Sequence, residues 1–485
     1  MIDPTFAGLL NRPAGFTDRP LLWDDITQAW TSECEIADLS LKLASRLEHG
    51  EKRLAFILAT NSKATLVGFL ALVAAGHAVA LIDPGLPEDR LAHLLACYQP
   101  DILLGSAPLS SLASTIAGNW VCSDPTVDVP ATAIRQGGNE PARLHPDLGL
   151  LLLTSGTTGG AKFVRLSWKA LVTNARQIAH SLAITSESVG VGHLPFHYSY
   201  GLSVVTSHLI AGARVALMID SLTSESFWAK VKASEGTHFA GVPFHYTVLA
   251  RLGFDMVPST VNMFTQAGGG LDARIQAMVL AKVEASQSRF CVMYGQTEAA
   301  PRIACLPSEL LLDKRGSVGV AMPASAISIC GQDGAALPVG QTGHVVYEGP
   351  NVMLGYADSR TDLALGDLMK GRLETGDLGW MDEDGFLYLS GRVARFAKIA
   401  GLRLSLDDIE TQLSLLGSIA CVDLGEQIAV VFEGEIPEDA KAQAKTLALA
   451  SKIPPTSFLV RRLAELPRKS NGKIDYALVK AALDV

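Results

Sequence analysis

The sequence contains few cysteines, and their spacing matches neither a disulfide scaffold nor a zinc-binding motif. The seven cysteines among 485 residues are an odd number, and no two form a Cys-x-x-Cys pair. This pattern argues against a disulfide scaffold and against a zinc ribbon, and favours reduced thiols in a cytoplasmic protein.

The chain also lacks the long apolar segments of membrane and secreted proteins. Residues 1–6 show no basic region followed by an apolar stretch, so no signal peptide is predicted. The most apolar window, residues 67–82, is interrupted by Gly76 and His77 and is too broken to cross a bilayer. We therefore expect a cytoplasmic protein with no membrane span.

Basic residues are fewer than acidic residues in this chain. The chain has 40 basic and 49 acidic residues, a net charge of −9, which argues against a nucleic-acid-binding surface. A hydrophobic content of 48% with 18% charged residues is typical of a globular enzyme. A chain of this length is too long for one compact core, so at least two domains are expected.

Apolar strand-like runs alternate with helix-like stretches, which predicts an α/β fold. Short strands with glycine-rich turns from residue 316 to 389 predict a β subdomain. Residues 391–394 resemble a domain boundary, followed by a smaller unit. Strands are expected at 54–58, 79–82, 101–104, 147–153, 215–219, 261–265 and 290–293, and helices at 62–75, 166–182, 227–235, 272–286 and 440–450, with another beginning near 242–246.

A glycine- and hydroxyl-rich segment, residues 154–163, directly follows the apolar run 150–153. Glycines let the backbone approach a ligand closely, successive N–H groups form an anion-binding concavity, and Lys162 supplies a point charge. The last glycine and the magnesium-binding hydroxyl of a P-loop are replaced by Ala161 and Phe163. The segment therefore predicts a polyphosphate-binding loop that differs from the loop of kinases and GTPases.

A second motif, residues 294–298, follows the predicted strand 290–293. Open α/β sheets bind their ligands at strand ends. Glu298 can hold Mg²⁺ there, and Tyr294 can stack on a base or form a pocket wall. The alternative is a helix N-terminus with an acidic first turn.

Two further motifs lie toward the C-terminus. Asp377, in a glycine-supported turn, can accept both hydroxyls of a ribose, and Arg392 can reach the same sugar. Asp384 and Gly385 instead predict a hairpin turn. Lys473, on a Ser/Asn/Gly loop, is either part of a solvated tail or a charge that a small domain delivers to a distant site.

Taken together and in this order, the motifs closely resemble those of the acyl-adenylate-forming enzymes. This superfamily includes acyl-CoA and aryl-CoA synthetases, nonribosomal-peptide adenylation domains and firefly-type luciferases. The resemblance runs from about Leu54 to Leu478. It implies a large N-terminal domain of packed α/β sheets with a β subdomain (1–393), a small mobile α+β C-terminal domain (394–485), and an active site between them.

The resemblance also implies roles for individual residues. The glycine loop, within residues 154–162, holds the ATP pyrophosphate. A triple glycine at 268–270 lies beside the adenine and the acid, and Tyr294 and Gly295 lie next to the nucleotide. Thr297 contacts the α-phosphate, Glu298 binds Mg²⁺, Lys473 contacts the acid carboxylate and the α-phosphate, and Gly401 lines a channel for the thiol. The loop residues are Thr154, Ser155, Gly156, Thr157, Thr158, Gly159 and Lys162, the triple glycine is Gly268, Gly269 and Gly270, and Asp377 and Arg392 hold the ribose.

The segment 194–201 resembles the Pro-x-x-His stretch of acyl-CoA and aryl-CoA synthetases. Tyr198 and its neighbours provide no aspartate for an α-ammonium group, which favours a small, neutral-tailed carboxylic acid over an amino acid. His197 is either a gate or pocket wall or a hydrogen-bonded core histidine. Among the departures from the family pattern, Ala394 replaces the usual hinge residue, Arg395 is a candidate substitute for it, and Tyr476 replaces a common arginine.

These residues predict an ATP- and Mg²⁺-dependent, AMP-forming acid–thiol ligase that uses coenzyme A. One alternative is a stand-alone ligase that loads the phosphopantetheine of an acyl carrier protein. Another is a non-catalytic nucleotide-binding homologue, which Ala394 suggests, although the retained charged residues, Lys473 among them, argue against it.

Overall fold

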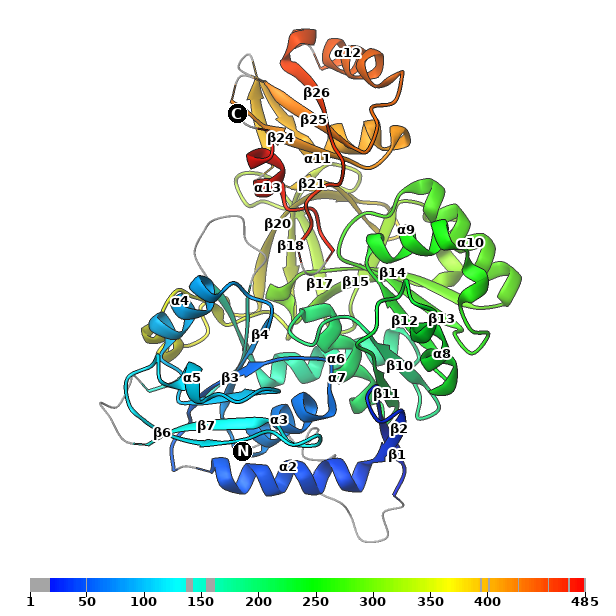
Figure 1. The fold of residues 1–485 in the computed structure, drawn as a ribbon. Coiled ribbons are helices and arrows are strands. Elements are labelled where there is room, and N and C mark those ends of the chain that lie inside the picture. The colour runs from blue at the N-terminus through cyan, green and yellow to red at the C-terminus, as the bar shows by residue number, and fades with distance from the viewer. Residues whose placement is uncertain are drawn as a thin grey trace.

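The computed structural model describes residues 18–48, 50–136, 143–153, 162–392, 395–399, 402–425, 427–451, 453–469 and 472–483. Figure 1 shows a large body that contains two extended sheets and a small C-terminal part at one end. The predicted α/β class is confirmed.

The first large sheet has eight strands in the order β19-β9-β8-β4-β3-β5-β7-β6. Strands β8, β4, β3 and β5 are parallel, and β7, β6, β9 and β19 pair antiparallel at the two sides. The bounds are β3 (Leu54–Leu58), β4 (Ala78–Ile82), β5 (Ile102–Gly105), β6 (Asn119–Ser123), β7 (Ala131–Gln136), β8 (Leu148–Leu153), β9 (Phe163–Ser167) and β19 (Gly355–Ala357). The predicted strands in this region are all present.

The predicted polyphosphate loop lies between two paired strands. Strand β8 ends at Leu153, and β9 begins at Phe163 and runs back antiparallel to it. Both ends of the loop are therefore anchored in one sheet. The helix predicted from residue 166 is wrong at its start, because Leu166 belongs to β9 and Ser167 caps a helix that begins at Trp168.

The second large sheet has thirteen strands in the order β17-β18-β20-β21-β16-β15-β14-β13-β12-β10-β11-β1-β2. Strands β11, β10, β12, β13 and β14 are parallel, so their carboxyl ends meet at one edge. The bounds in this half are β1 (Pro20–Asp24), β2 (Ala29–Ser32), β10 (Val189–Gly192), β11 (Arg214–Leu217), β12 (His238–Gly241), β13 (Met263–Gln266) and β14 (Arg289–Gly295).

The rest of this sheet is antiparallel, and all its strands but β15 begin within the segment 316–389 predicted as a β subdomain, whereas β19 of that segment belongs to the first sheet. The strands of this antiparallel part are β15 (Arg302–Leu306), β16 (Ser317–Ala321), β17 (Ala326–Cys330), β18 (Gly343–Glu348), β20 (Arg372–Met381) and β21 (Leu387–Arg392). The hairpin turn predicted at Asp384 and Gly385 is confirmed, since it connects the paired strands β20 and β21.

Helices fill the space between the two sheets and cover their outer faces. Leu70, Leu171 and Leu202, from three different helices, share one buried cluster with residues of both sheets, which joins the sheets into one body. Helix α3 is buried around almost its whole circumference, as its uniformly apolar sequence requires. The bounds are α2 (Glu33–Leu47), α3 (Lys63–Ala74), α4 (Glu88–Tyr98), α5 (Ser110–Ala113), α6 (Trp168–Ser181), α7 (Ser199–Ile210), α8 (Glu225–Ala233), α9 (Pro243–Leu252) and α10 (Ala273–Ser286), with 3₁₀ turns η1 (Phe254–Met256), η2 (Thr297–Ala299), η3 (Ser308–Leu310) and η4 (Arg360–Ala364).

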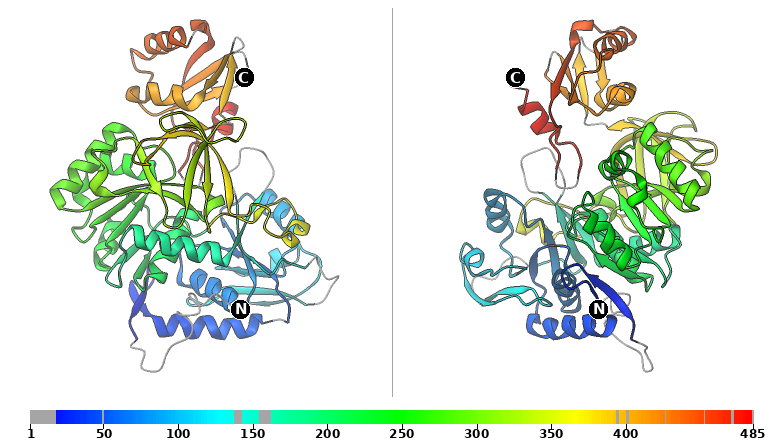
Figure 2. Two further views of the ribbon diagram at one scale, coloured as in Figure 1. Left: turned by 180° about the vertical axis from the view of Figure 1, so that it is seen from behind. Right: turned by 45° about the vertical axis from the view of Figure 1, so that its right-hand side comes forward.

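The C-terminal part has its own sheets and its own cores. Two apolar clusters consist wholly of residues from 397 onward, as a separately folded unit requires. In both views of Figure 2 this part lies at one end of the molecule, beside the antiparallel strands. It comprises β22 (Phe396–Ile399), β23 (Leu402–Ser405), α11 (Leu406–Leu413), η5 (Ser414–Leu416), β24 (Ile419–Asp423), β25 (Ile428–Glu433), α12 (Ala440–Ala450), η6 (Pro455–Ser457), β26 (Phe458–Leu463) and α13 (Tyr476–Ala481).

Across the described residues, no helix combines the length and the apolar character that crossing a membrane requires.

Candidate functional site

Three loops meet at the carboxyl edge of the parallel strands. Val242 follows β12, Gly268 follows β13, and Thr297 lies just beyond β14, in three strands paired in register. A β-carbon on Gly268 would lie 3.3 Å from Cγ1 of Val242 and 3.1 Å from the hydroxyl oxygen of Tyr198. Gly268 also has φ of +92°, a conformation that favours glycine. The predicted glycine segment and the predicted motif 294–298 therefore belong to one site.

Asp377 is the centre of a buried polar cluster at this edge. The Tyr294 hydroxyl donates a hydrogen bond to one of its carboxylate oxygens, and Nε of Arg392 donates to the other at 2.8 Å. Strands β20 and β21 set this arrangement, since Asp377 and Arg392 are direct cross-strand partners. The side chain of Asp377 is 5% exposed whereas that of Arg392 is 53% exposed, so the arginine is available at the surface of the cluster.

The charges in this cluster influence one another. The negative charge of Asp377 raises the pKa of Arg392 above its ordinary value. Burial, and then the same carboxylate, raise the pKa of Tyr294 well above its usual range, so its hydroxyl stays protonated and serves as a donor. Each Asp377 oxygen keeps lone-pair capacity beyond the bond it already accepts, which leaves room for the hydroxyls of a sugar.

Glu298 is connected to Lys162 through a residue that sequence reasoning missed, Tyr356. The Tyr356 hydroxyl donates to Oε1 of Glu298 at 2.8 Å, and Nζ of Lys162 lies 4.0 Å from the centre of the Tyr356 ring. Strand β19, which carries Tyr356, pairs with β9, which begins directly after Lys162. The structure therefore brings the lysine of the predicted polyphosphate loop and the predicted Mg²⁺ ligand into contact with the same tyrosine.

Thr297 and Glu298 lie in a short turn that follows β14. Residues 297–299 form a 3₁₀ turn, too short for the helix N-terminus that was the alternative interpretation. The hydroxyl oxygens of Thr297 and Ser199 are 3.2 Å apart, which ties this turn to the start of α7. At Gly295, a β-carbon would lie 2.0 Å from the carbonyl oxygen of Pro301, so only glycine fits there.

Lys473 reaches this edge from the C-terminal part. The segment between β26 and α13 descends toward the large body in Figure 1, and it forms a small hairpin in which Arg468 pairs with Ile474. A β-carbon on Gly472 would lie 3.2 Å from Cγ2 of Val242, and Cε of Lys473 lies 3.8 Å from the corresponding position on Gly268. The hairpin thus places Lys473 among the loops of the N-terminal part.

The electrostatic surroundings of Lys473 identify its neighbours. Its pKa is lowered to about 8, chiefly because burial removes the ammonium group from water and next because the positive charge of Arg392 is close. Asp377 and Glu298 oppose this shift. Three predicted site residues from two different motifs therefore lie within electrostatic range of the predicted catalytic lysine.

His197 contacts a residue outside this cluster, Asp83. Its Nε2 is 3.5 Å from Oδ2 of Asp83, beyond the end of β4. Burial lowers the pKa of His197, so its imidazole is held neutral, although the negative charge of Asp83 opposes this effect. Nδ1 of His197 is buried without a hydrogen-bond partner among the described residues, so both alternatives, the gate or pocket wall and the hydrogen-bonded core histidine, stay predictions. Asp83 was not singled out from the sequence.

Some predicted residues cannot be placed. Thr154, Ser155, Gly156, Thr157, Thr158, Gly159 and Gly401 lie outside the described residues, as does Ala394. Of the remaining glycines, the carbonyl of Gly269 accepts a hydrogen bond of 2.7 Å from the Gln266 side chain, and Gly270 borders open space.

A bound divalent cation would depend on the nucleotide for most of its ligands. No three His, Cys, Asp or Glu side chains gather into a metal site within the part of the chain that the structure describes. Mg²⁺ commonly takes one or two carboxylates together with substrate phosphates and waters. Glu298, next to Lys162, fits that arrangement.

Comparison with known proteins identifies the family. The sequence model described as "AMP-binding enzyme" matches residues 11–357. The 2-succinylbenzoate–CoA ligase of Enterococcus faecalis is 26% identical over 387 residues, covering 78% of this chain and 76% of its own length. The oxalate–CoA ligase of Arabidopsis thaliana is 27% identical over 516 residues, covering 99% and 98%.

The fold is also that of solved structures. The O-succinylbenzoate coenzyme A synthetase of Bacillus subtilis, in complex with AMP, superposes with a TM-score of 0.78 at 21% identity, covering 99% of this chain and 98% of its own. The complex of that enzyme with ATP and magnesium ion gives 0.77 at 21% identity, covering 98% and 99%. Since the family match covers most of its length, this chain belongs to the family of AMP-binding enzymes.

Proposed function

We propose that this chain is an ATP-dependent, AMP-forming acid–thiol ligase that converts a small carboxylic acid into acyl-AMP and then transfers the acyl group to coenzyme A. The observation that carries the proposal is the position of Lys473, which lies against Gly268 and within range of Arg392, Asp377 and Glu298. Membership of the family and full-length relatives named as CoA ligases of organic acids support it.

The site residues divide into groups that suit the parts of MgATP. Residues 154–159 and Lys162 would hold the pyrophosphate, and Glu298 would hold Mg²⁺, which neutralises phosphate charge. Asp377 would accept hydrogen bonds from the ribose hydroxyls, with Arg392 beside it. Tyr294, Gly295 and the glycines 268–270 would border the nucleotide and the acid.

In the first half-reaction, a carboxylate oxygen of the acid attacks the α-phosphorus of ATP. The bond from that phosphorus to the bridging oxygen breaks, which yields acyl-AMP and pyrophosphate. The protein mainly positions the reactants and stabilises the developing negative charge. The Lys473 ammonium and the Thr297 hydroxyl are the donors for this purpose, and the anionic reactants would raise the pKa of Lys473 and keep it charged.

In the second half-reaction, the thiol sulfur attacks the acyl carbonyl carbon, a thioester forms, and AMP leaves. Lys473 lies beside Gly268 in the described arrangement, so the thiol needs a different approach to the acyl group. We assign this change to rotation of a C-terminal domain, residues 394–485, against residues 1–393, with Gly401 lining the thiol channel. The separate apolar cores of the C-terminal part support this division.

The names of the relatives bear on the acid and on the acceptor. The names of the relatives include succinylbenzoate and oxalate, and a relative from Bacillus thuringiensis at 25% identity is named as a D-alanyl carrier protein ligase. Coenzyme A is our proposed acceptor, and a carrier-protein phosphopantetheine is the alternative that the acceptor experiment distinguishes. A cytoplasmic location stays a prediction.

The deciding experiment measures acid-dependent conversion of ATP to AMP and pyrophosphate with the purified chain. Pools of aliphatic, aryl and amino acids are tested with Mg²⁺, with and without coenzyme A. We expect AMP with a non-amino acid, and turnover that rises with coenzyme A. AMP that stalls near one equivalent despite coenzyme A indicates a carrier-protein acceptor, and no AMP from any pool overturns the ligase proposal. Omission of acid and chelation of Mg²⁺ are the controls.

A further inference from the structure

Arg302 is a buried arginine with no acidic partner among the described residues. Its residue surface is 3% exposed, it takes part in none of the ion pairs found in the described ranges, and its Nε has no hydrogen-bond partner. The guanidinium lies 4.0 Å from the centre of the Tyr200 ring, a contact that compensates only part of the cost of a buried charge. The structure therefore contains a positive group that lacks an anion.

The backbone around Arg302 is held firmly in place. The side chain of Asn174 bonds both its N–H and its carbonyl, each at 3.0 Å, and Asn351 donates to the same carbonyl at 2.9 Å. All three residues are buried. Because these asparagines anchor the start of β15, Arg302 is fixed before any ligand arrives, as a recognition group should be.

Arg302 lines a narrow internal cavity between α6, α7 and the second large sheet. The cavity is small, with a volume of about 20 Å³. His208 and His238 line the same cavity, and Nε2 of each has no hydrogen-bond partner. A space of this size admits only a small group and excludes a bulky tail.

Tyr198 lies near both the cavity residue Tyr200 and the proposed reaction centre. The Tyr198 hydroxyl oxygen is 3.1 Å from the β-carbon position of Gly268, beside Lys473. The Tyr198 ring is 6.3 Å from the Tyr200 ring, and burial raises the pKa of Tyr198 while the charge of Arg302 opposes that shift. Tyr198 therefore marks the direction that leads from Lys473 toward Arg302.

We infer that the acid substrate carries a second carboxylate at the far end of its tail, and that Arg302 determines specificity by pairing with it. The inference rests on the proposed ligase function and names its substrate class. It departs from the neutral tail expected from the sequence, which was based on the absence of an aspartate and took no account of Arg302. A buried guanidinium favours a carboxylate over a neutral tail because a neutral tail leaves its positive charge uncompensated.

The first test uses the unmodified protein and matched acids. Linear and aromatic dicarboxylic acids of graded length are each compared with their mono-amide and monomethyl ester, which keep the shape and lose one charge. We expect kcat/KM for AMP formation to favour one or more diacids over their own mono-amides by at least about 100-fold. Equal rates within every pair, or a preference for neutral tails, overturn the inference.

The second test changes Arg302 itself. Arg302→Met removes the charge at similar length, and Arg302→Lys keeps a charge without the planar fork. Arg274→Met, an exposed arginine on α10, is the matched control. We expect Arg302→Met to lower the diacid-to-amide ratio at least 10-fold, Arg302→Lys to lower it less, and the control to leave it unchanged. A fall in both rates at a constant ratio indicates a structural arginine and contradicts the inference.

Binding measurements separate this inference from the ligase proposal. Thermal stabilisation of the protein by each acid is recorded with a non-hydrolysable ATP analogue present. Selective stabilisation by diacids without any AMP formation overturns the ligase function and leaves the pairing of Arg302 supported. AMP formation without selectivity for diacids supports the ligase function and overturns the pairing of Arg302 with a second carboxylate. If Arg302→Met does not fold, the matched acids on the unmodified protein decide the question.

Discussion

The ε-carbon of Lys473 lies 3.8 Å from the position that a β-carbon on Gly268 would occupy, although the two residues belong to different parts of the fold. The Tyr198 hydroxyl lies 3.1 Å from the same position. Gly268 thus lies at the carboxyl edge of the parallel sheet, next to Lys473 from the C-terminal part and next to Tyr198. A side chain there would separate the lysine from the acid that it is proposed to contact.

Lys473→Ala is expected to reduce the adenylation half-reaction by about 10²–10³, in line with the loss of one strong transition-state donor. The measurement is acid-dependent release of pyrophosphate in single-turnover conditions. Lys232→Ala, an exposed lysine on α8, is the matched control and should retain full activity. Near-normal pyrophosphate release by Lys473→Ala would remove the lysine from the proposed mechanism.

The kcat/KM of adenylation for ATP is expected to fall as the pH rises through about 8. The pKa of Lys473 is lowered to about 8 in the free protein, so the ammonium group is present below that pH and is lost above it. Because kcat/KM for ATP reports groups of the free enzyme, it should drop about tenfold per pH unit above the inflection. Arg392→Gln should move the inflection upward, since it removes a nearby positive charge.

Lys473→Arg is the control for this pH profile. A guanidinium stays charged throughout the accessible range, so its profile should lack the inflection near pH 8, at whatever rate the variant retains. An inflection that persists unchanged in Lys473→Arg would assign the titration to another group.

Asp377→Asn is expected to weaken ATP binding about 10- to 100-fold. The change removes the charged acceptor that the Tyr294 hydroxyl and Arg392 share, and hydrogen bonds to charged groups contribute about 1.5–3 kcal/mol each. The dissociation constant is measured directly with a fluorescent ATP analogue. Asp384→Asn, in the exposed turn of the same hairpin, should alter it by less than about threefold. Equal effects of the two changes would contradict the assignment of Asp377.

Local patterns in the sequence predict the elements of this fold well. Ser62 and Asp272 were expected at helix starts, and each accepts a hydrogen bond from a backbone N–H in the first turn. Capping is a local interaction, so it is visible in a few neighbouring residues. Strand β9 was missed for the opposite reason. It carries the fully buried Arg165, whose guanidinium bonds the distant carbonyls of Leu354 and Tyr356.

The predicted site residues gather as expected, but their supporting contacts do not follow from the sequence. Tyr356 meets Glu298 and Lys162 because β19 pairs with β9, a pairing between segments far apart in the chain. Nothing in the local pattern around Tyr356 indicates that partner. Arg302 was likewise passed over, because burial of a charged residue depends on packing from several elements.

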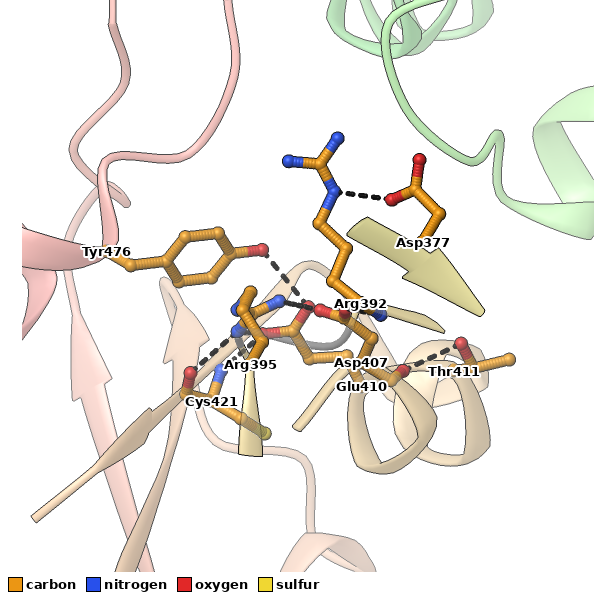
Figure 3. A network of polar contacts seen from close by, with 8 residues as sticks. All are labelled: Asp377, Arg392, Arg395, Asp407, Glu410, Thr411, Cys421 and Tyr476. Carbon is orange, nitrogen blue, oxygen red and sulfur yellow. Dashed lines mark hydrogen bonds and ion pairs between the residues drawn. The ribbon is translucent and has the colours of Figure 1, made fainter. Parts of the chain in front are cut away.

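The sequence also left the role of Arg395 open, as a candidate replacement for the hinge residue at the domain boundary. Figure 3 shows this arginine enclosed within the C-terminal part. Its guanidinium pairs with Asp407 and with both carboxylate oxygens of Glu410, at 2.7 and 3.1 Å, and lies 3.6 Å from the centre of the Tyr476 ring. Arg395 is therefore an internal anchor of this part in the described arrangement.

The same network connects the domain boundary with the hairpin that carries Lys473. The Tyr476 hydroxyl donates to Glu410 at 3.1 Å, and Tyr476 begins α13 directly beyond the hairpin. Asp407 accepts a hydrogen bond of 3.0 Å from the backbone N–H of Arg392, next to the proposed ribose site. A change at Arg395 should therefore affect both the stability of the C-terminal part and the position of Lys473.

Arg395→Met is expected to destabilise the C-terminal part by about 2–3 kcal/mol, because it leaves two partly buried carboxylates without their cation. Tyr476→Phe removes one hydroxyl bond and should cost about 1 kcal/mol. Hydrogen exchange of α11 and α13 measures these losses locally, which matters because a chain with two cores need not unfold in one step. Arg461→Met, an exposed arginine on β26, is the control. If Arg395→Met leaves exchange unchanged and instead alters only thioester formation, Arg395 acts as the hinge residue after all, and its ion pairs must break during the reaction.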